Sequence, residues 1–134
     1  MSSIQRLSKL SQKIWDAKYR FRDGQAVIDA TIEDTWRRTA SALASVEVNN
    51  KDGWESRFLA VLQDFRFIPG GRVLAGAGTA KRVTLFNCFV MGVISDSLEG
   101  IFSALQEGAI TMQQGGGVGY DFSTLRPLGT QAKG

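Results

Sequence analysis

A cluster of glycines in the second half of the sequence sets the strongest limit on its fold. Four of the five residues in Gly115-Gly116-Gly117-Val118-Gly119 are glycine, and each glycine inside a helix costs roughly 1 kcal/mol relative to alanine. A helix that enters this stretch must therefore end there. The apolar residues before it repeat at helical spacing, which predicts a helix up to Gln113 with Asp96 as its cap and Glu99 completing a capping box.

The segments on either side of this helix are predicted to be strands. The run from Thr84 to Ile94, TLFNCFVMGVI, is short, apolar and rich in aromatic and β-branched residues, which predicts a strand buried on both faces. A second strand is expected over 117–122. A strand, a helix and a strand in succession imply a right-handed crossover and parallel pairing. Because two strands do not make an independently stable sheet, we expect the sequence to be cut from a larger α/β domain.

The first half of the sequence is predicted to be helical. Apolar side chains recur at helical spacing in three stretches, with a loop expected at 48–53. The helical stretches are 4–22, 29–46 and 54–65. Three tryptophans are expected in the core because they lie on the helix faces that carry leucine and phenylalanine. They are Trp15, Trp36 and Trp54.

The residues Phe67-Ile68-Pro69-Gly70-Gly71 divide the sequence, because proline and paired glycines interrupt a helix. They predict a helical region over 1–66 and a second region over 67–134. The small residues from Arg72 to Thr84 predict a loop in which the backbone approaches another group closely. Gly76-Ala77-Gly78 would also suit a phosphate cradle, although the Lys-Ser/Thr pair that follows in such loops is absent.

Composition excludes several classes of chemistry. Histidine is absent and Cys88 is the only cysteine in 134 residues, which removes imidazole-based hydrolysis and histidine-ligated zinc. A lone cysteine cannot form an intrachain disulfide, in agreement with a reducing compartment. The net charge of +3 is too small to predict nucleic-acid binding, and no apolar run approaches the roughly 20 residues of a membrane span. A cytoplasmic protein is expected.

Several short motifs occur in a fixed order along the second half. They are GRVLAGAGT from Gly71, Asn87-Cys88, the helix start at Asp96, the triple glycine followed by Val118-Gly119, and LRPLG from Leu125. Together they resemble the catalytic subunit of ribonucleotide reductase, closest to the adenosylcobalamin-dependent class II enzymes. IWDAKYR from Ile14 and EDTWRR from Glu33 resemble the opening helices of that class. The resemblance implies a mixed α/β, predominantly helical fold: a helical N-terminal region, then the first strand-helix-strand of a ten-stranded α/β barrel, truncated.

The resemblance also implies a substrate site. Cys88 matches the first of two redox-active cysteines, which delivers electrons to the ribose and then forms a disulfide with a distant partner outside this sequence. Asn87, Gly116 and Gly117 match positions that line the site, where missing Cβ atoms let the backbone approach the nucleotide. Gly71 falls where relatives carry a serine or threonine that contacts the nucleotide, so only backbone contact is left there.

An effector site and several partners are implied as well. Asp96 matches a residue that binds the deoxynucleotide effector, and Arg126 matches a residue of the flexible loop over the same effector. A carboxylate can accept a hydrogen bond from a ribose hydroxyl, and a guanidinium suits phosphate. The implied enzyme is a ribonucleoside-diphosphate reductase, dimeric, with adenosylcobalamin and a thioredoxin-like reductant. We expect the cobalamin site to lie outside this segment and the segment to be inactive alone.

Each functional role has a structural alternative. A free cysteine in an apolar strand is usually a small core residue, Asp96 serves equally as a helix cap, Arg126 as an exposed loop charge and the glycines as a helix terminator. The chain as a whole could instead be a nucleotide-binding, regulatory or oligomerisation module without redox activity. The reductase hypothesis requires the Cys88 sulfur to face the glycine turn rather than a closed apolar interior.

Overall fold

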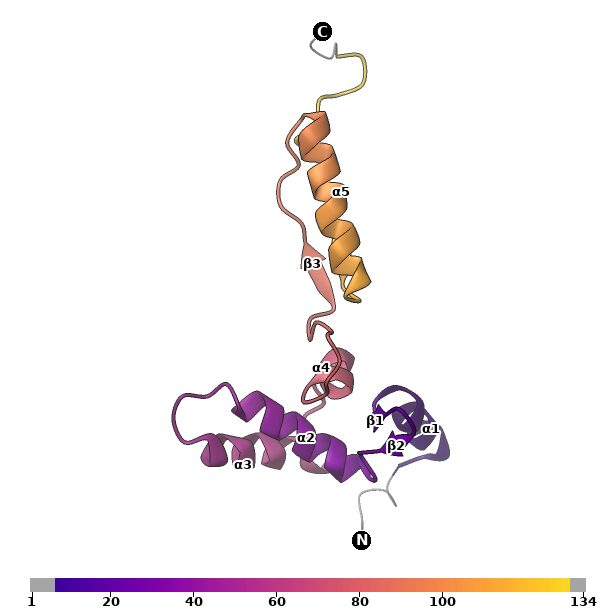
Figure 1. Ribbon diagram of the computed structural model, residues 1–134, viewed down its shortest axis with the longest axis vertical. Coiled ribbons are helices and arrows are strands. Elements are labelled where there is room, and N and C mark those ends of the chain that lie inside the picture. Colours follow the sequence, from indigo (N-terminus) through magenta and orange to yellow (C-terminus); the bar gives the residue numbers. More distant parts are fainter. Residues whose placement is uncertain (1–6, 131–134) are drawn as a thin grey trace. The chain divides into compact units, whose positions relative to one another are not determined.

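The computed structural model describes residues 7–130, which fall into two compact units divided between Lys81 and Arg82 (Figure 1). The first unit contains helices and a short hairpin, and the second contains a two-stranded parallel sheet with one long helix. A helical region followed by strand, helix and strand confirms the predicted fold class. Within 7–130, no helix is long and apolar enough to cross a membrane.

The first unit is built from helices joined by short turns. Its elements are α1 (Lys9–Lys18), β1 (Arg22–Asp23), β2 (Ala26–Val27), α2 (Ile32–Ala44), α3 (Lys51–Leu62), the 3₁₀ turn η2 (Gln63–Phe65) and α4 (Gly71–Gly76). The strands β1 and β2 form an antiparallel hairpin between α1 and α2. Helices α2 and α3 lie side by side and pack against each other along their length (Figure 1).

A small apolar core lies between α2 and α3. Ile32, Trp36, Ala40 and Leu62 are buried together, and Phe65 meets the Trp36 ring edge-on with 5.1 Å between centroids. Trp15 packs against this cluster from α1. The predicted core position is therefore confirmed for Trp36, which is buried, and for Trp15, which is half-buried and packs against the cluster, whereas Trp54 lies outside the cluster.

Trp54 is only half-buried because it lies in the first turn of α3, away from the cluster. Its ring stacks on Phe58, and the Arg57 guanidinium lies 5.0 Å from its centroid. Helix α3 also begins three residues before the predicted start. The cause is Asn50, which adopts a left-handed φ of 53° and accepts a hydrogen bond from the Gly53 N–H at 3.3 Å, so that it caps the helix.

The segment after Pro69 is only partly the loop that the sequence predicted. It contains the short helix α4, whose C-terminal carbonyls are bound by Arg38 from α2. The predicted close approach of backbone to another group occurs just beyond it, at Gly78. This residue has a φ of +70°, and a Cβ there would lie 2.8 Å from the Arg38 Cγ.

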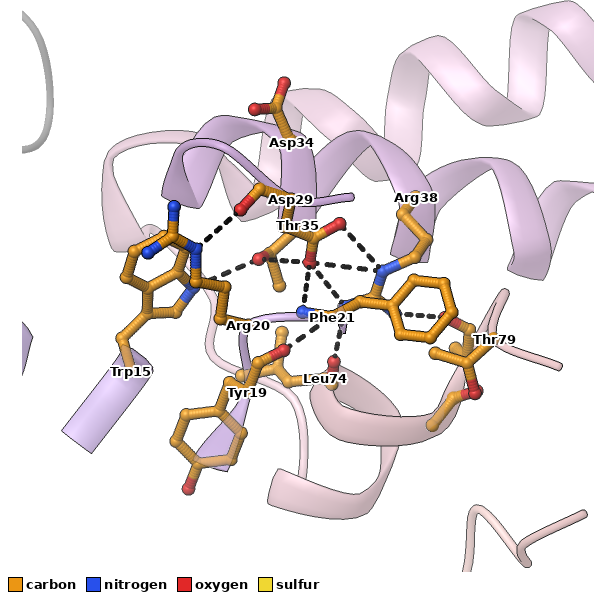
Figure 2. Close-up of polar contacts among 12 residues, drawn as sticks. Trp15, Tyr19, Arg20, Phe21, Asp29, Asp34, Thr35, Arg38, Leu74 and Thr79 are labelled. Atoms are coloured by element: carbon orange, nitrogen blue, oxygen red, sulfur yellow. Dashed lines mark hydrogen bonds and ion pairs between the residues drawn. The ribbon is translucent and has the colours of Figure 1, made fainter. Parts of the chain in front are cut away.

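A buried ion pair joins these elements of the first unit (Figure 2). Asp29 is 1% exposed, and its Oδ2 lies 2.9 Å from the Nη2 of Arg38. The same carboxylate accepts hydrogen bonds from the Thr35 hydroxyl at 2.7 Å and the Phe21 N–H at 3.2 Å. Because the Trp15 indole in turn donates to Thr35 at 3.0 Å, the network links α1, the hairpin and α2.

The second unit consists of β3 (Cys88–Val90), α5 (Leu98–Gln113) and β4 (Gly117–Gly119). The two strands pair in parallel, as predicted, with Cys88 opposite Gly117. Two details differ from the prediction. The strands are three residues long, and β3 is not buried on both faces, since Cys88 and Val90 are exposed. The reason is that β4 is the only strand that pairs with β3 among the described residues.

The cap of α5 also differs from the prediction. Ser97, rather than Asp96, is the N-cap, and its Oγ accepts a hydrogen bond from the Gly100 N–H at 3.0 Å. The capping box expected between Asp96 and Glu99 therefore does not form. Asp96 lies one residue before the cap, where its carboxylate is paired with Arg126.

We expect Gly108→Ala to destabilise the second unit. Tyr120 packs across α5 at Gly108, and a Cβ there would lie 1.6 Å from the Tyr120 hydroxyl oxygen. The clash should outweigh the roughly 1 kcal/mol of helix propensity gained, leaving a net loss of about 1–2 kcal/mol in the free energy of unfolding. Gly119→Ala is the control, because no atom lies within 4 Å of its added Cβ. Equal urea midpoints for the two variants would contradict this packing.

The capping box of α2 should make stability fall in acid. The Thr31 N–H donates to the Asp34 carboxylate at 2.8 Å, and this hydrogen bond is the main cause that holds the pKa of Asp34 below its ordinary 3.8. A lowered folded-state pKa gives stability that is present above the unfolded pKa and is lost as pH falls through the folded one. Asp34→Ala should lower the free energy of unfolding by about 1 kcal/mol at neutral pH. It should also reduce the further loss of stability as the pH falls, which is the acid limb of the stability profile.

Urea unfolding at neutral and acidic pH measures the effect. Asp23→Ala removes the same charge from the exposed hairpin and serves as the control. If the two alanine variants lost stability equally at neutral pH and kept identical acid limbs, the capping box would have no such role.

Candidate functional site

The Cys88 sulfur lies on the glycine side of the sheet. Cys88 is the first residue of β3 and is exposed. It pairs with Gly117, and a Cβ built on Gly117 would lie 3.7 Å from the Cys88 Sγ and 3.4 Å from the Asn87 carbonyl oxygen. The thiol is therefore open to solvent next to bare backbone, and it does not point into a closed apolar interior.

The glycines of the turn do different things. Gly115 has a φ of +87°, which ends α5. Gly116 is buried, and a Cβ there would lie 2.8 Å from the Phe89 ring. Gly117 is exposed and donates its N–H to the Asn87 carbonyl at 2.8 Å. The missing side chain at Gly116 thus serves packing against Phe89, and the missing side chain at Gly117 leaves the space beside the thiol open.

The predicted substrate residues lie in two places. The structure brings Asn87, Cys88 and Gly117 together at the start of the two paired strands, with Gly116 directly behind. Gly71 belongs to the first unit and is the first residue of α4. A Cβ on Gly71 would lie 3.2 Å from the Tyr19 hydroxyl oxygen, so the tyrosine takes up part of the room that a side chain would need.

The two predicted effector residues are partners of each other. The Arg126 Nε donates to both carboxylate oxygens of Asp96, at 2.8 and 3.0 Å, and its Nη2 donates to the Asp96 carbonyl at 3.2 Å. Both side chains are about one-third exposed, at 34% and 35%. The Thr124 hydroxyl supports the same loop by donating to the Ile94 carbonyl at 2.7 Å. If this ion pair opens, the guanidinium and the carboxylate can each bind a polar ligand.

Thiol and ion pair lie at opposite ends of the strands. Cys88 and Gly117 begin β3 and β4, whereas Asp96 follows the carboxyl end of β3 and Arg126 follows that of β4. The carboxyl ends of parallel strands meet at one edge of a sheet, where ligands of α/β folds commonly bind. The second unit thus offers one reactive group and one charged pair at separate edges.

Asp29 and Arg38, the most buried ion pair among the described residues of the first unit, carried no predicted functional role. The sequence could not distinguish Arg38 from Arg37, because the two arginines are adjacent and carry the same charge, although Arg37 is exposed. Among residues 7–130, no group of three or more Cys, Asp or Glu side chains is placed to hold a metal ion.

Comparison with known proteins gives two family matches. The family described as "Ribonucleotide reductase, all-alpha domain" matches residues 5–82, and "Ribonucleotide reductase, barrel domain" matches residues 86–134. The vitamin B12-dependent ribonucleoside-diphosphate reductases of Mycobacterium tuberculosis and Thermoplasma acidophilum are 33% and 31% identical over 92% of this chain. The ribonucleoside-diphosphate reductase subunit alpha of Chlamydia pneumoniae is 27% identical over 92% of it. The chain spans only 18%, 15% and 11% of these relatives, respectively.

Proposed function

The chain belongs to the ribonucleotide reductase family, and we propose on this premise that it forms the N-terminal part of a catalytic subunit that reduces ribonucleotides to deoxyribonucleotides. The observation that carries the proposal is the exposed Cys88 sulfur beside the bare backbone of Gly117. A thiol that serves as a reductant has to reach a bound sugar and then a second thiol, and this position leaves both approaches open.

Cys88 is proposed to act as one half of a dithiol. Its partner cysteine comes from outside this sequence, which contains no other. In each turnover the two thiols give up two electrons and two protons, one ribose hydroxyl leaves as water, and a disulfide remains. A thioredoxin-like dithiol then restores the pair by thiol–disulfide exchange. Asn87 and Gly117 border the sugar, and the backbone of Gly71 contacts the nucleotide.

Adenosylcobalamin is the proposed cofactor of the complete enzyme. Support comes from the two relatives whose names describe them as vitamin B12-dependent. This sequence contains no histidine, so it offers no imidazole to the cobalt, and none of the described residues is proposed to hold the cofactor. Its contribution in such an enzyme is to generate the radical that activates the sugar.

Asp96 and Arg126 are proposed to bind a deoxynucleotide effector. The carboxylate would accept a hydrogen bond from the sugar and the guanidinium would bind phosphate. Helix α5 begins directly after Asp96 and leaves several large apolar side chains uncovered. They are Leu98, Phe102 and Leu105, which are 75%, 64% and 54% exposed. We propose that this stripe packs against a second subunit, which would place the effector site next to a dimer interface.

Cys88→Ser should abolish multiple turnover in the full-length enzyme supplied with an external dithiol, because serine cannot form a disulfide. Steady-state formation of deoxynucleotide measures the effect. Effector binding by calorimetry is the control, and it should be unchanged because Asp96 and Arg126 lie at the other edge of the sheet. Continued multiple turnover with intact effector binding would favour the nucleotide-binding module without redox activity. The 134 residues alone should form no product.

Effector binding should require the Asp96–Arg126 pair to open. Arg126→Gln should weaken binding of a deoxynucleoside triphosphate at least tenfold, the order expected for loss of a charge-assisted hydrogen bond. Asp96→Asn should tighten binding of inorganic triphosphate several-fold, because it frees the guanidinium. This probe has no sugar, so it loses no contact with the Asp96 carboxylate. Arg82→Gln, at an exposed arginine of the same unit, is the control. Weaker triphosphate binding by Asp96→Asn would contradict the competition.

A further inference from the structure

The guanidinium of Arg38 is shared between a carboxylate and the end of another helix (Figure 2). On one side its Nε and Nη2 reach the Asp29 carboxylate at 3.2 and 2.9 Å. On the other side it donates to the Leu74 carbonyl at 3.0 Å and to the Ala77 carbonyl. A longer contact of 3.4 Å reaches the Tyr19 carbonyl. The side chain is 10% exposed, so water cannot easily replace these hydrogen bonds.

Helix α4 lacks the features that stabilise a helix by itself. It has six residues, fewer than a helix needs to persist in water. It has no basic residue in its last turn and no side-chain cap at its start. The last four carbonyls of a helix have no partner within it. The Gly76 carbonyl accepts a hydrogen bond from the Thr79 hydroxyl at 2.8 Å. Arg38 supplies, from α2, the donors for the Leu74 and Ala77 carbonyls and the positive charge that α4 does not provide.

The stem of Arg38 shapes the chain that leaves α4. At Gly78 the backbone turns with a φ of +70°, and a Cβ there would lie 2.8 Å from the Arg38 Cγ and 3.0 Å from its carbonyl oxygen. Gly76 and Ala77, just before this turn, are buried. The end of α4 is thus held by the charged head of Arg38 and confined by its aliphatic part.

Stability alone does not explain a buried ion pair at this position. Desolvation offsets most of the attraction between buried charges, and apolar residues of similar volume often stabilise a protein as well or better. Apolar residues cannot, however, donate hydrogen bonds to the carbonyls of Leu74 and Ala77. Asp29 is itself fixed by Thr35 and Phe21, so it keeps the guanidinium aimed at α4. The arrangement is suited to holding α4 in one position relative to α2.

We propose that Arg38 is a positioning residue for substrate binding: through α4 it fixes the backbone of Gly71, at the other end of that helix. The inference rests on the proposed function, in which Gly71 contacts the nucleotide. Gly71 lies three residues before Leu74, about 4.5 Å along the helix axis. Because Gly71 has no side chain that could adjust, its contact depends entirely on where its backbone lies. A shift of α4 would therefore weaken substrate binding directly.

Arg38→Lys in the full-length enzyme tests this inference. Lysine keeps a positive charge next to Asp29 but lacks the planar fork that reaches several acceptors at once. The KM for the ribonucleotide should rise about tenfold, as expected for loss of a charge-assisted hydrogen bond, and kcat should change much less. Amide exchange should accelerate in α4 and stay slow in α2. Arg37→Lys is the matched control, because Arg37 is exposed and pairs with Asp34 on its own helix.

The double variant Asp29→Asn/Arg38→Met separates positioning from stability. It removes both charges, and the amide oxygen of the asparagine can still accept from the Thr35 hydroxyl and the Phe21 N–H, so the melting temperature should stay near that of the wild type. The KM should remain raised because the Leu74 and Ala77 carbonyls still lack the Arg38 donor. A wild-type KM in either variant would overturn the inference, and so would loss of the folded state in both. A wild-type enzyme that forms no deoxynucleotide would instead overturn the proposed function.

Discussion

The contact between Arg38 and Asp29 organises the first unit. Without the guanidinium, the Leu74 and Ala77 carbonyls at the end of α4 lose their donor, and without Asp29 a cation would be buried with no opposite charge. The carboxylate also accepts hydrogen bonds from the Thr35 hydroxyl and the Phe21 N–H. One ion pair thus holds together α2, the end of the hairpin and α4. The apolar core around Trp36 is small, so directed polar contacts carry much of the architecture.

In the second unit the equivalent constraint is the register of the parallel strands. Pairing Cys88 with Gly117 puts the one thiol next to a residue that has no side chain to cover it. A shift by one residue would reverse which side chains face the glycines. In this register the Phe89 ring packs against Gly116, in the volume that a side chain there would need. Packing at Gly116 therefore supports exposure of the thiol at Gly117.

The wrong local predictions share one physical cause. Asp96 and Ser97 are both good caps, and the ion pair with Arg126, thirty residues away, leaves the cap to Ser97. The segment after Pro69 has the composition of a loop, and distant donors from Arg38 make part of it helical. The apolar run around Cys88 predicts a buried strand, but burial depends on neighbouring elements that the residues of this run do not specify. Each outcome depends on a long-range contact.

The order of the elements, the helix-ending glycines, the parallel strands and the family could all be predicted from the sequence, and the proposed thiol and effector residues come from the same motifs. These follow from local periodicity, from backbone freedom at glycine and from short ordered motifs, all of which are encoded within a few residues. Three facts came from the fold alone: Asp96 and Arg126 bind each other, Gly116 and Gly117 face different surroundings, and the Arg38 side chain is only 10% exposed while Arg37 is open to solvent. Those facts depend on which distant side chains meet, and neither spacing nor composition specifies that.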